Sequence, residues 1–262
     1  MSTPEPFEVF AIRYAWVDRK ASENFIDGDP HESSMPMDYF VWVAKSPSKT
    51  WVIDTGFNQA AADKRKREFL RCPSEGLALL GVNASDVEDV IITHLHYDHV
   101  GNFDLFAKAN FHLQDSEMAY ATGRLMKDSF YSHAFEVDEV VAMVRNVYAG
   151  RVEFYDGDVE LAENISLHHV GGHTKGLQVV RLWTETGWLV LASDASHYYA
   201  NMEQRRPFPI LVDQDKMIAG WDKMKMLVDD ESRIIPGHDP EVMKRYKAPA
   251  PELEGIAVRL DN

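Results

Sequence analysis

The chain has 262 residues, of which 45% are apolar and 26% charged, the composition of a soluble globular protein with room for a large core. Its 42 acidic residues outnumber its 27 basic ones, and the net charge of −15 argues against nucleic acid or an anionic membrane as a partner. A single cysteine excludes an internal disulfide. No run approaches the ~18 apolar residues of a membrane helix, and the first residues lack signal-peptide features, so we expect a cytoplasmic protein with no membrane partner.

The first third of the chain predicts three strands, because its runs alternate and are rich in β-forming residues. These strands are expected at 7–14, 38–44 and 51–56. The polar residues 18–36 have no periodicity and predict a long loop, in which we interpret His31 as a solvated side chain. Helices are expected at 58–71 and 74–80, and the basic run from Lys64 to Arg67 is expected to face mostly outward.

The segment 93–99 follows an apolar run at 87–92 that predicts a buried strand. Alternate side chains of an extended chain point the same way, so His94 and His96 converge on one point. Asp98 and His99 lie where the chain leaves the strand and face a second point nearby. Two cations about 3.5–4 Å apart are the arrangement of two-metal hydrolysis. Imidazole nitrogen with some carboxylate favours Zn²⁺, and Mn²⁺, Fe²⁺ or Co²⁺ are compatible with it.

The rest of the chain mixes strands and helices. Residues 115–149 are mostly helical and rich in aromatic residues and methionine, which favour the core but also suit a substrate pocket or a homodimer surface. We expect this segment and the loop at 18–37 to border the pocket. Strands are expected at 109–114, 151–155, 159–161, 165–170, 177–183 and 188–192, with a hairpin turn at 184–187 and a helix at 213–228. No repeat or linker is visible, so we expect one domain over 1–262, and periodicity alone indicates only mixed α and β structure.

The pattern His94-x-His96-x-Asp98-His99 after an apolar strand resembles the signature of the metallo-β-lactamase superfamily. The resemblance spans roughly residues 38–240 and implies three later ligands. Their candidates are a histidine in a Gly-rich turn, an aspartate after a strand and a histidine near the C-terminus: His173, Asp194 and His238. The resemblance also implies an αββα fold, two face-to-face sheets with helices outside.

A dinuclear metal centre follows from the same resemblance. It implies a first cation held by His94, His96 and His173, a second held by Asp98, His99 and His238, and a bridging Asp194. It also implies that Asp54 supports the ligands without binding metal. A metal-bound hydroxide would then attack the substrate carbonyl, with Asp98 acting both as ligand and in catalysis.

Within the superfamily, the sequence is similar to N-acyl-homoserine-lactone lactonases at Leu95, Tyr97, the stretch 170–176 and Gln178. This similarity implies a small-molecule lactone or related ester as substrate, and a role in quorum quenching. Those lactonases usually carry a tyrosine three residues after the bridging aspartate, where this chain has His197. We expect His197 to donate a hydrogen bond to the developing oxyanion, unless Tyr198 makes that contact.

Other functions fit the sequence less well. A glyoxalase-II-like thioester hydrolase would use the same ligands, but its glutathione-binding cations could come only from Lys244, Arg245 and Lys247. β-Lactamases usually lack the bridging aspartate, and a non-catalytic metal-binding protein would be expected to have lost a ligand. No Gly-x-Ser-x-Gly or nucleotide-binding glycine motif is present. No role is assigned to the remaining histidines, which are His112, His133, His168 and His169.

Overall fold

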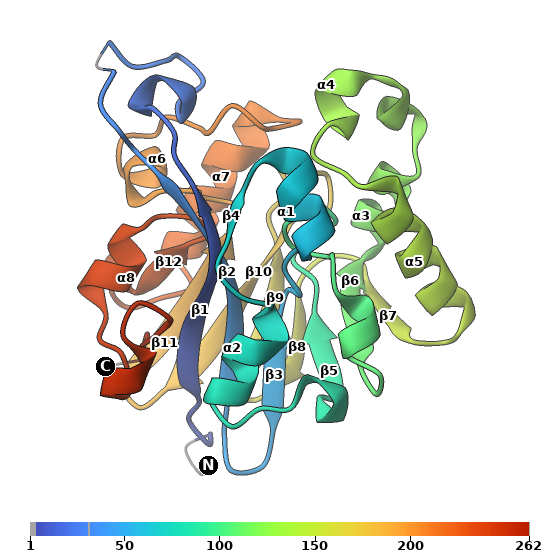
Figure 1. Cartoon of the computed structure of the whole chain (residues 1–262), viewed down its shortest axis with the longest axis vertical. Helices are drawn as coiled ribbons and strands as arrows, with labels where there is room; N and C mark the ends of the chain where they lie inside the picture. Colours follow the sequence, from blue (N-terminus) through green and yellow to red (C-terminus); the bar gives the residue numbers. More distant parts are fainter. Residues whose placement is uncertain (1–3, 31, 262) are drawn as a thin grey trace.

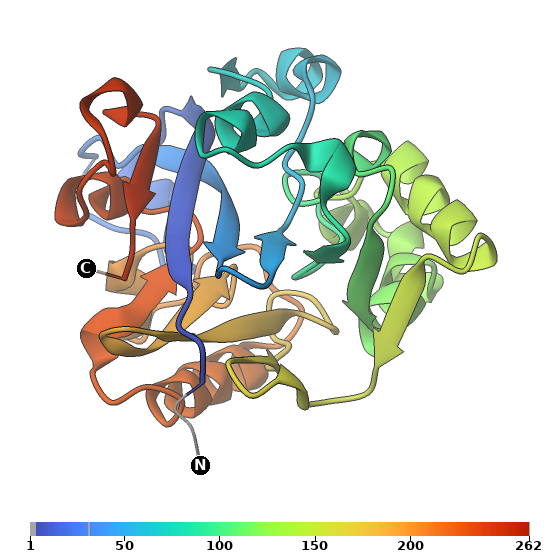
Figure 2. The ribbon, with the colours of Figure 1, turned by 90° about the horizontal axis from the view of Figure 1, so that it is seen from below.

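Two β-sheets lie face to face, with helices against the outer side of each, in a computed structural model that describes residues 4–30 and 32–261 (Figure 1). Seen from below, the blue and green strands form one layer and the yellow and orange strands the other (Figure 2). This arrangement confirms the predicted αββα sandwich. His31 lies outside the described residues.

The first sheet has eight strands in the order β13-β1-β2-β3-β5-β6-β7, with β4 paired to β1. These strands are β1 (Glu8–Val17), β2 (Met37–Lys45), β3 (Thr50–Ile53), β4 (Glu68–Phe69), β5 (Asp89–Ile91), β6 (Asn110–Gln114), β7 (Val152–Tyr155) and β13 (Ala257–Arg259). In β1, Phe10 and Ile12 pack in the core on the helix side with Leu77, while Val9 and Ala11 pack in the core shared with the second sheet. Burial on both faces explains why this strand is almost continuously apolar.

The second sheet has five strands in the order β12-β11-β10-β9-β8. They are β8 (Val159–Ala162), β9 (Ile165–His169), β10 (Gln178–Thr184), β11 (Gly187–Ser193) and β12 (Ile234–Pro236). The predicted strand at 151–155 is present as β7. It pairs in parallel with β6 in the first sheet, because the helical segment between them carries the chain back to the same sheet edge.

The helices are α1 (Gln59–Arg65), α2 (Pro73–Leu79), α3 (Asp115–Ala121), α4 (Ser129–Ser132), α5 (Val137–Tyr148), α6 (Tyr199–Glu203), α7 (Gln214–Lys225) and α8 (Glu241–Arg245). The predicted helix at 58–71 is too long, because Lys66 adopts a left-handed conformation with φ 56° that ends α1. Helix α7 covers the second sheet, with Met217, Trp221 and Met224 buried along one face as their spacing predicts.

The segments that carry the predicted metal ligands leave the two sheets at a common edge. Strands β11 and β12 are parallel, so Asp194 and His238 follow neighbouring strand ends. The ligand-rich segment follows β5 of the facing sheet. The buried Gln178 ties the sheets together at this edge, since its side-chain Nε2 donates to the Ile92 carbonyl at 2.9 Å and its backbone N–H donates to the Thr93 carbonyl at 3.1 Å. The fold therefore brings distant parts of the sequence to one place.

Candidate metal centre

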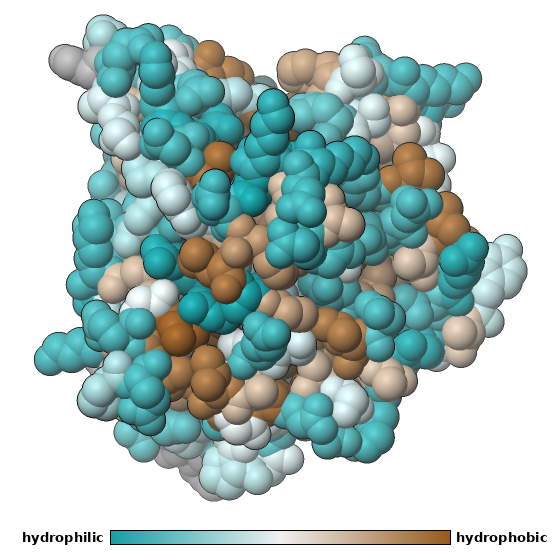
Figure 3. Space-filling view, in the orientation of Figure 1, coloured by the Kyte–Doolittle hydropathy of each residue, from teal (hydrophilic) through white to brown (hydrophobic). Residues whose placement is uncertain are grey.

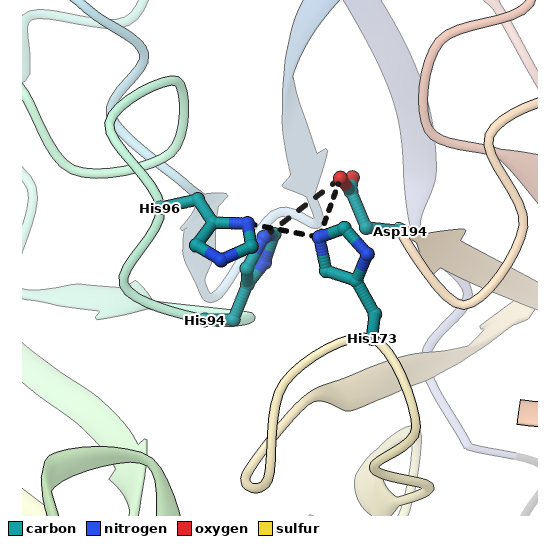
Figure 4. Close-up of side chains that lie close together, drawn as sticks. All are labelled: His94, His96, His173 and Asp194. Carbon is teal, nitrogen blue, oxygen red and sulfur yellow. Dashed lines mark hydrogen bonds and ion pairs between the residues drawn. The ribbon is translucent and has the colours of Figure 1, made fainter. Parts of the chain in front are cut away.

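Seven side chains from four loops converge at this edge. Their ligand atoms form one group of His94, His96, His173 and Asp194, and a second of Asp98, His99 and His238. Asp194 lies between the groups. Its Oδ2 is 3.1 Å from His173 Nε2, and its Oδ1 is 2.9 Å from His238 Nε2 and 3.2 Å from His99 Nε2. Figure 4 shows His94, His96 and His173 pointing toward one another and toward Asp194. This is the grouping that the sequence predicts.

Most of these histidines are held by the ring nitrogen that faces away from the cluster. Nδ1 of His173 is 2.6 Å from the Ile210 carbonyl, and Nδ1 of His238 is 2.8 Å from the Asp38 carbonyl. His99 Nδ1 lies 2.7 Å from Asp54 Oδ2. Such contacts fix the tautomer and leave the opposite nitrogen free for a metal ion. The supporting position predicted for Asp54 agrees with this geometry.

Asp54 also organises the strand end that carries the ligands. Its carboxylate accepts from the Thr93 backbone N–H and hydroxyl, both at 2.8 Å. Asp54 adopts φ 62°, and Ser193, which precedes Asp194, adopts φ 46°. Left-handed backbone at residues other than glycine costs of order 1–3 kcal/mol each and concentrates at functional sites. The surrounding hydrogen bonds thus hold two strained residues in place beside the ligands.

The fully buried Glu117 joins the two loops that carry His94, His96 and His173. Its Oε1 accepts from the Leu95 N–H and its Oε2 from the Gly176 N–H, both at 2.9 Å. A Cβ at Gly176 would lie 2.2 Å from the Glu117 backbone, so only glycine fits there. No pattern in the sequence indicates this role, because Glu117 lies within a predicted helix, remote in sequence from either loop.

The ionisation of the cluster suits metal binding. Burial lowers the pKa of His94 and His96 well below the usual histidine value, so both rings are neutral and offer lone pairs. Burial alone would raise the pKa of Asp194, but the histidines around it lower that pKa well below the usual range. Within residues 4–30 and 32–261, the buried Nε2 of His94 has no hydrogen-bond partner, and the buried Nε2 of His99 makes no well-aligned hydrogen bond, although it lies 3.2 Å from Asp194 Oδ1. Buried polar atoms are rarely left unpaired, and imidazole and carboxylate donors in this arrangement fit divalent transition metals.

A cavity of about 180 Å³ opens onto the cluster. Arg19 and Met37 line it from one side, and His133 and Ala134 from the other. The prediction that residues 18–37 and 115–149 border the pocket is thereby confirmed. In the space-filling view, the upper edge of the molecule is notched between these two parts of the chain (Figure 3).

Two of the four basic residues expected to face outward line this cavity instead. Arg65 and Arg67 are part of its wall, whereas Lys66 is exposed. The prediction was wrong for these two arginines because the left-handed turn at Lys66 reverses the chain between them. His133, for which the sequence predicts no role, lines the same cavity.

His197 and Tyr198 differ in position. The His197 ring lines the cavity, stacks on Phe208 at a centroid distance of 3.8 Å, and places Nε2 3.0 Å from Asp194 Oδ2. Burial lowers its pKa to about 3, so the ring is neutral. The Tyr198 hydroxyl instead donates toward the backbone carbonyls of residues 35 and 36 and does not line the cavity. Of the two candidates for a substrate contact, only His197 faces the site.

The family model of the metallo-beta-lactamase superfamily matches residues 36–238, more than half of the chain. The chain belongs to the metallo-beta-lactamase superfamily. Among curated members, the chain is similar to an N-acyl homoserine lactonase of Bacillus thuringiensis, with 28% identity over 172 residues, and to the N-acyl homoserine lactonase AttM of Azorhizobium caulinodans, with 27% over 187 residues. The first match covers 64% of this chain and 62% of the relative, and the second covers 69% and 68%. The chain thus spans less than two thirds of the Bacillus relative.

Solved structures of the superfamily share the fold over nearly the whole chain. A crystal structure of a quorum-quenching N-acyl homoserine lactone lactonase superposes with a TM-score of 0.78 at 21% identity, covering 95% of this chain and 98% of that one. AidC, described as a dizinc quorum-quenching lactonase, superposes with a TM-score of 0.71 at 19% identity, covering 92% and 90%. Within residues 4–30 and 32–261, no helix combines the length and apolar character needed to cross a bilayer.

Proposed function

We propose that this protein is a dinuclear metal hydrolase that opens a lactone ring. His94, His96 and His173 would hold one divalent ion, Asp98, His99 and His238 a second, and Asp194 would bridge them. The observation that carries the proposal is the position of Asp194, whose two oxygens face the two histidine groups separately. The similarity to proteins named N-acyl homoserine lactonases supports a lactone as substrate.

Zinc is the ion we propose, because the donor set is mainly imidazole with carboxylate. When bound, the ions supply Lewis acidity, which polarises a carbonyl and makes water more acidic. A quorum-quenching role and a cytoplasmic location follow from the sequence and stay predictions.

The residues around the ions would position the substrate and move protons. The Asp98 carboxylate lines the cavity, and its ion pairs within residues 4–30 and 32–261 are long, 3.8 Å to His99 and 3.7 Å to His238. We assign to it the transfer of a proton from the attacking water to the ring oxygen that leaves. We assign to the His197 Nε2–H, which lies 3.0 Å from Asp194 Oδ2, the donation of a hydrogen bond to the substrate carbonyl oxygen once the ions hold Asp194. Asp54 and Glu117 act indirectly, by holding the ligand loops.

The proposed function is tested by a substrate panel with purified, metal-loaded protein. The panel contains acyl-homoserine lactones, simple γ- and δ-lactones, S-lactoylglutathione and nitrocefin. Ring opening releases acid and is measured by pH-stat titration. We expect hydrolysis of at least one lactone class and little turnover of S-lactoylglutathione and nitrocefin. Fast hydrolysis of S-lactoylglutathione with no lactone turnover would favour the thioester hydrolase instead.

A further inference from the structure

Part of the cavity wall is basic, although the chain as a whole is strongly acidic. Three arginines line the cavity: Arg19 from the loop after β1, Arg65 from the end of α1, and Arg67 after the turn that ends α1. The carboxylates that line the cavity are Asp98 and Asp194, both assigned above to the metal ions. In a chain with net charge −15, this local excess of positive charge needs a reason.

Arg65 has a counter-ion, Glu136, which it shares with the exposed Lys64. Its guanidinium lies 2.8 Å from Glu136 and also donates to the His133 and Phe135 carbonyls at 3.0 and 3.2 Å. These contacts tether the segment that precedes α5. Arg65 therefore has a structural role, and its charge is paired with a carboxylate of the protein.

Arg67 and Arg19 are different, because neither has a carboxylate within ion-pair distance among residues 4–30 and 32–261. Arg67 donates from Nε to the Tyr97 hydroxyl at 3.2 Å and from Nη1 to the Arg65 carbonyl at 2.9 Å. Arg19 donates from Nε to Asn24 at 2.7 Å and from Nη2 to the Glu23 carbonyl at 2.8 Å. Both are half-buried. Neutral acceptors thus orient each guanidinium and leave one terminal nitrogen of each without a hydrogen-bond partner in the described structure.

An oriented, half-buried guanidinium with spare donors matches the planar oxygens of a carboxylate. Desolvating such a charge without a counter-ion is unfavourable, and a bound anion would remove that cost. The cavity also has apolar walls, formed by Met37, Phe208 and Ile210, and its volume of about 180 Å³ lies below the ~300–1,000 Å³ typical of drug-sized ligands. A small, singly charged organic molecule fits these features better than a long neutral acyl chain.

We propose that the substrate is a small lactone that carries a carboxylate, and that Arg67 and Arg19 bind this carboxylate while the ring faces Asp98 and His197. The inference rests on the proposed lactonase function and adds the substrate class. In the reaction, water oxygen bonds to the ring carbonyl carbon, the ring C–O bond breaks, and the leaving oxygen takes a proton. The product is a hydroxy-dicarboxylate.

A matched pair of substrates tests the proposal: γ-butyrolactone-γ-carboxylate and its primary amide, which has nearly the same shape and no charge. The variants are Arg67→Gln and Arg19→Gln, with Arg67→Lys as the charge-conserving form. Lys66→Asn is the control, because it removes the same charge from an exposed neighbouring residue and asparagine tolerates the left-handed backbone at this position. Thermal melting of each variant checks that it is folded.

We expect the metal-loaded wild type to favour the carboxylate over the amide in kcat/KM. Each Arg→Gln variant should lower kcat/KM for the carboxylate about tenfold to a hundredfold, the range for loss of a charge-assisted hydrogen bond. The loss should lie mainly in KM, and kcat/KM for the amide should change little. Arg67→Lys should recover part of the lost kcat/KM for the carboxylate, and Lys66→Asn should match the wild type. Equal turnover of both substrates by the wild type, or equal losses on both in the arginine variants, would overturn the carboxylate proposal while leaving the lactonase function intact.

A binding measurement separates this inference from the proposed function. Calorimetry with 2-hydroxyglutarate, the ring-opened product of the test lactone, should show binding to the wild type that weakens in Arg67→Gln and Arg19→Gln. If no lactone of any kind is hydrolysed, the proposed function fails, and this titration still decides the role of the arginines. Unchanged binding in both variants would refute the proposal that these arginines bind the substrate carboxylate.

Discussion

His112 with Asp89 on the first sheet and the metal centre both combine histidine with aspartate, and they differ in how many ring nitrogens are already used. His112 on β6 places Nδ1 2.8 Å from the Tyr155 hydroxyl and Nε2 2.8 Å from Asp89 Oδ1. Its ring also stacks parallel to Tyr155 and meets the edge of Trp51. Both nitrogens have partners, and the ring acts as a link between strands of the first sheet.

At the metal centre, the same residue types leave nitrogens open. His99 is held through Nδ1 by Asp54, while its Nε2 faces Asp194 Oδ1 at 3.2 Å and makes no well-aligned hydrogen bond within the described part of the chain. His94 likewise has an unpartnered Nε2 and lies beside Thr93 through Nδ1. The comparison shows that residue type does not define a metal site. The defining feature is a set of buried nitrogens and carboxylate oxygens that converge on one point, with the rings oriented by hydrogen bonds on the side away from the cluster.

Removal of Asp194 should have the largest effect on metal content and lactone hydrolysis. Asp194→Ala deletes the carboxylate between the two histidine groups, so we expect bound metal to fall clearly and lactone hydrolysis to drop by several orders of magnitude. Elemental analysis and initial rates measure both, and circular dichroism checks the fold. A variant that keeps the wild-type metal content and rate would show that Asp194 is not the bridge.

Removal of Asp54 tests whether the outer hydrogen bond to a ligand histidine contributes to metal binding. Asp54→Ala leaves every proposed ligand in place but frees His99 Nδ1 and Thr93. Loss of such an outer partner typically costs about 10–100-fold in metal affinity or activity. Competition with a chromophoric chelator measures the affinity, and Asp54→Asn, which keeps the shape, should lose less than Asp54→Ala. No change in metal affinity would mean that His99 does not depend on Asp54.

His197 should matter for rate and not for metal content. His197→Ala should lower kcat by less than the ~10²–10³ of an isolated oxyanion donor, because bound metal would share the stabilisation. His197→Tyr should recover part of the loss, and Tyr198→Phe should keep the wild-type rate, since its hydroxyl points to backbone carbonyls. Loss of metal in His197→Ala would instead make His197 a ligand, which its distance from Asp194 and His238 would allow.

Substitution of His112 should lower stability and leave metal content and kcat unchanged, which is the opposite of the effect expected at the metal centre. His112→Phe leaves Asp89 and the Tyr155 hydroxyl without this partner. Asp89 keeps its ion pair with Lys49, but the loss of both hydrogen bonds costs about 1–3 kcal/mol, so urea denaturation should show a lower free energy of unfolding. Metal content and kcat should stay at the wild-type level. A large fall in metal content would contradict the division between a structural and a functional histidine.

The sequence predicted the local part of the site well. The convergence of His94 and His96 was predicted from the alternation of an extended chain, and the two side chains lie in one group, although β5 already ends at Ile91. His173, Asp194 and His238 were identified through the family resemblance, because their loops meet only in the folded sheets. Most strands were predicted near their observed positions. That residues 1–262 form one domain stays a prediction.

The parts that escaped prediction depend on tertiary contacts. Arg67 enters the cavity because one residue before it reverses the chain, and Glu117 joins two loops that are remote in sequence. The place of β7 in the first sheet depends on where the preceding helices return the chain. Neither periodicity nor composition carries this information.

Metal analysis combined with chelation tests the central claim most directly. Purified protein should contain about two transition-metal ions per chain. Chelation should abolish lactone hydrolysis, and added Zn²⁺ should restore it in proportion to the metal bound, up to two ions. Full hydrolysis by thoroughly metal-free protein would contradict the assignment of this histidine and aspartate cluster as a dinuclear catalytic centre.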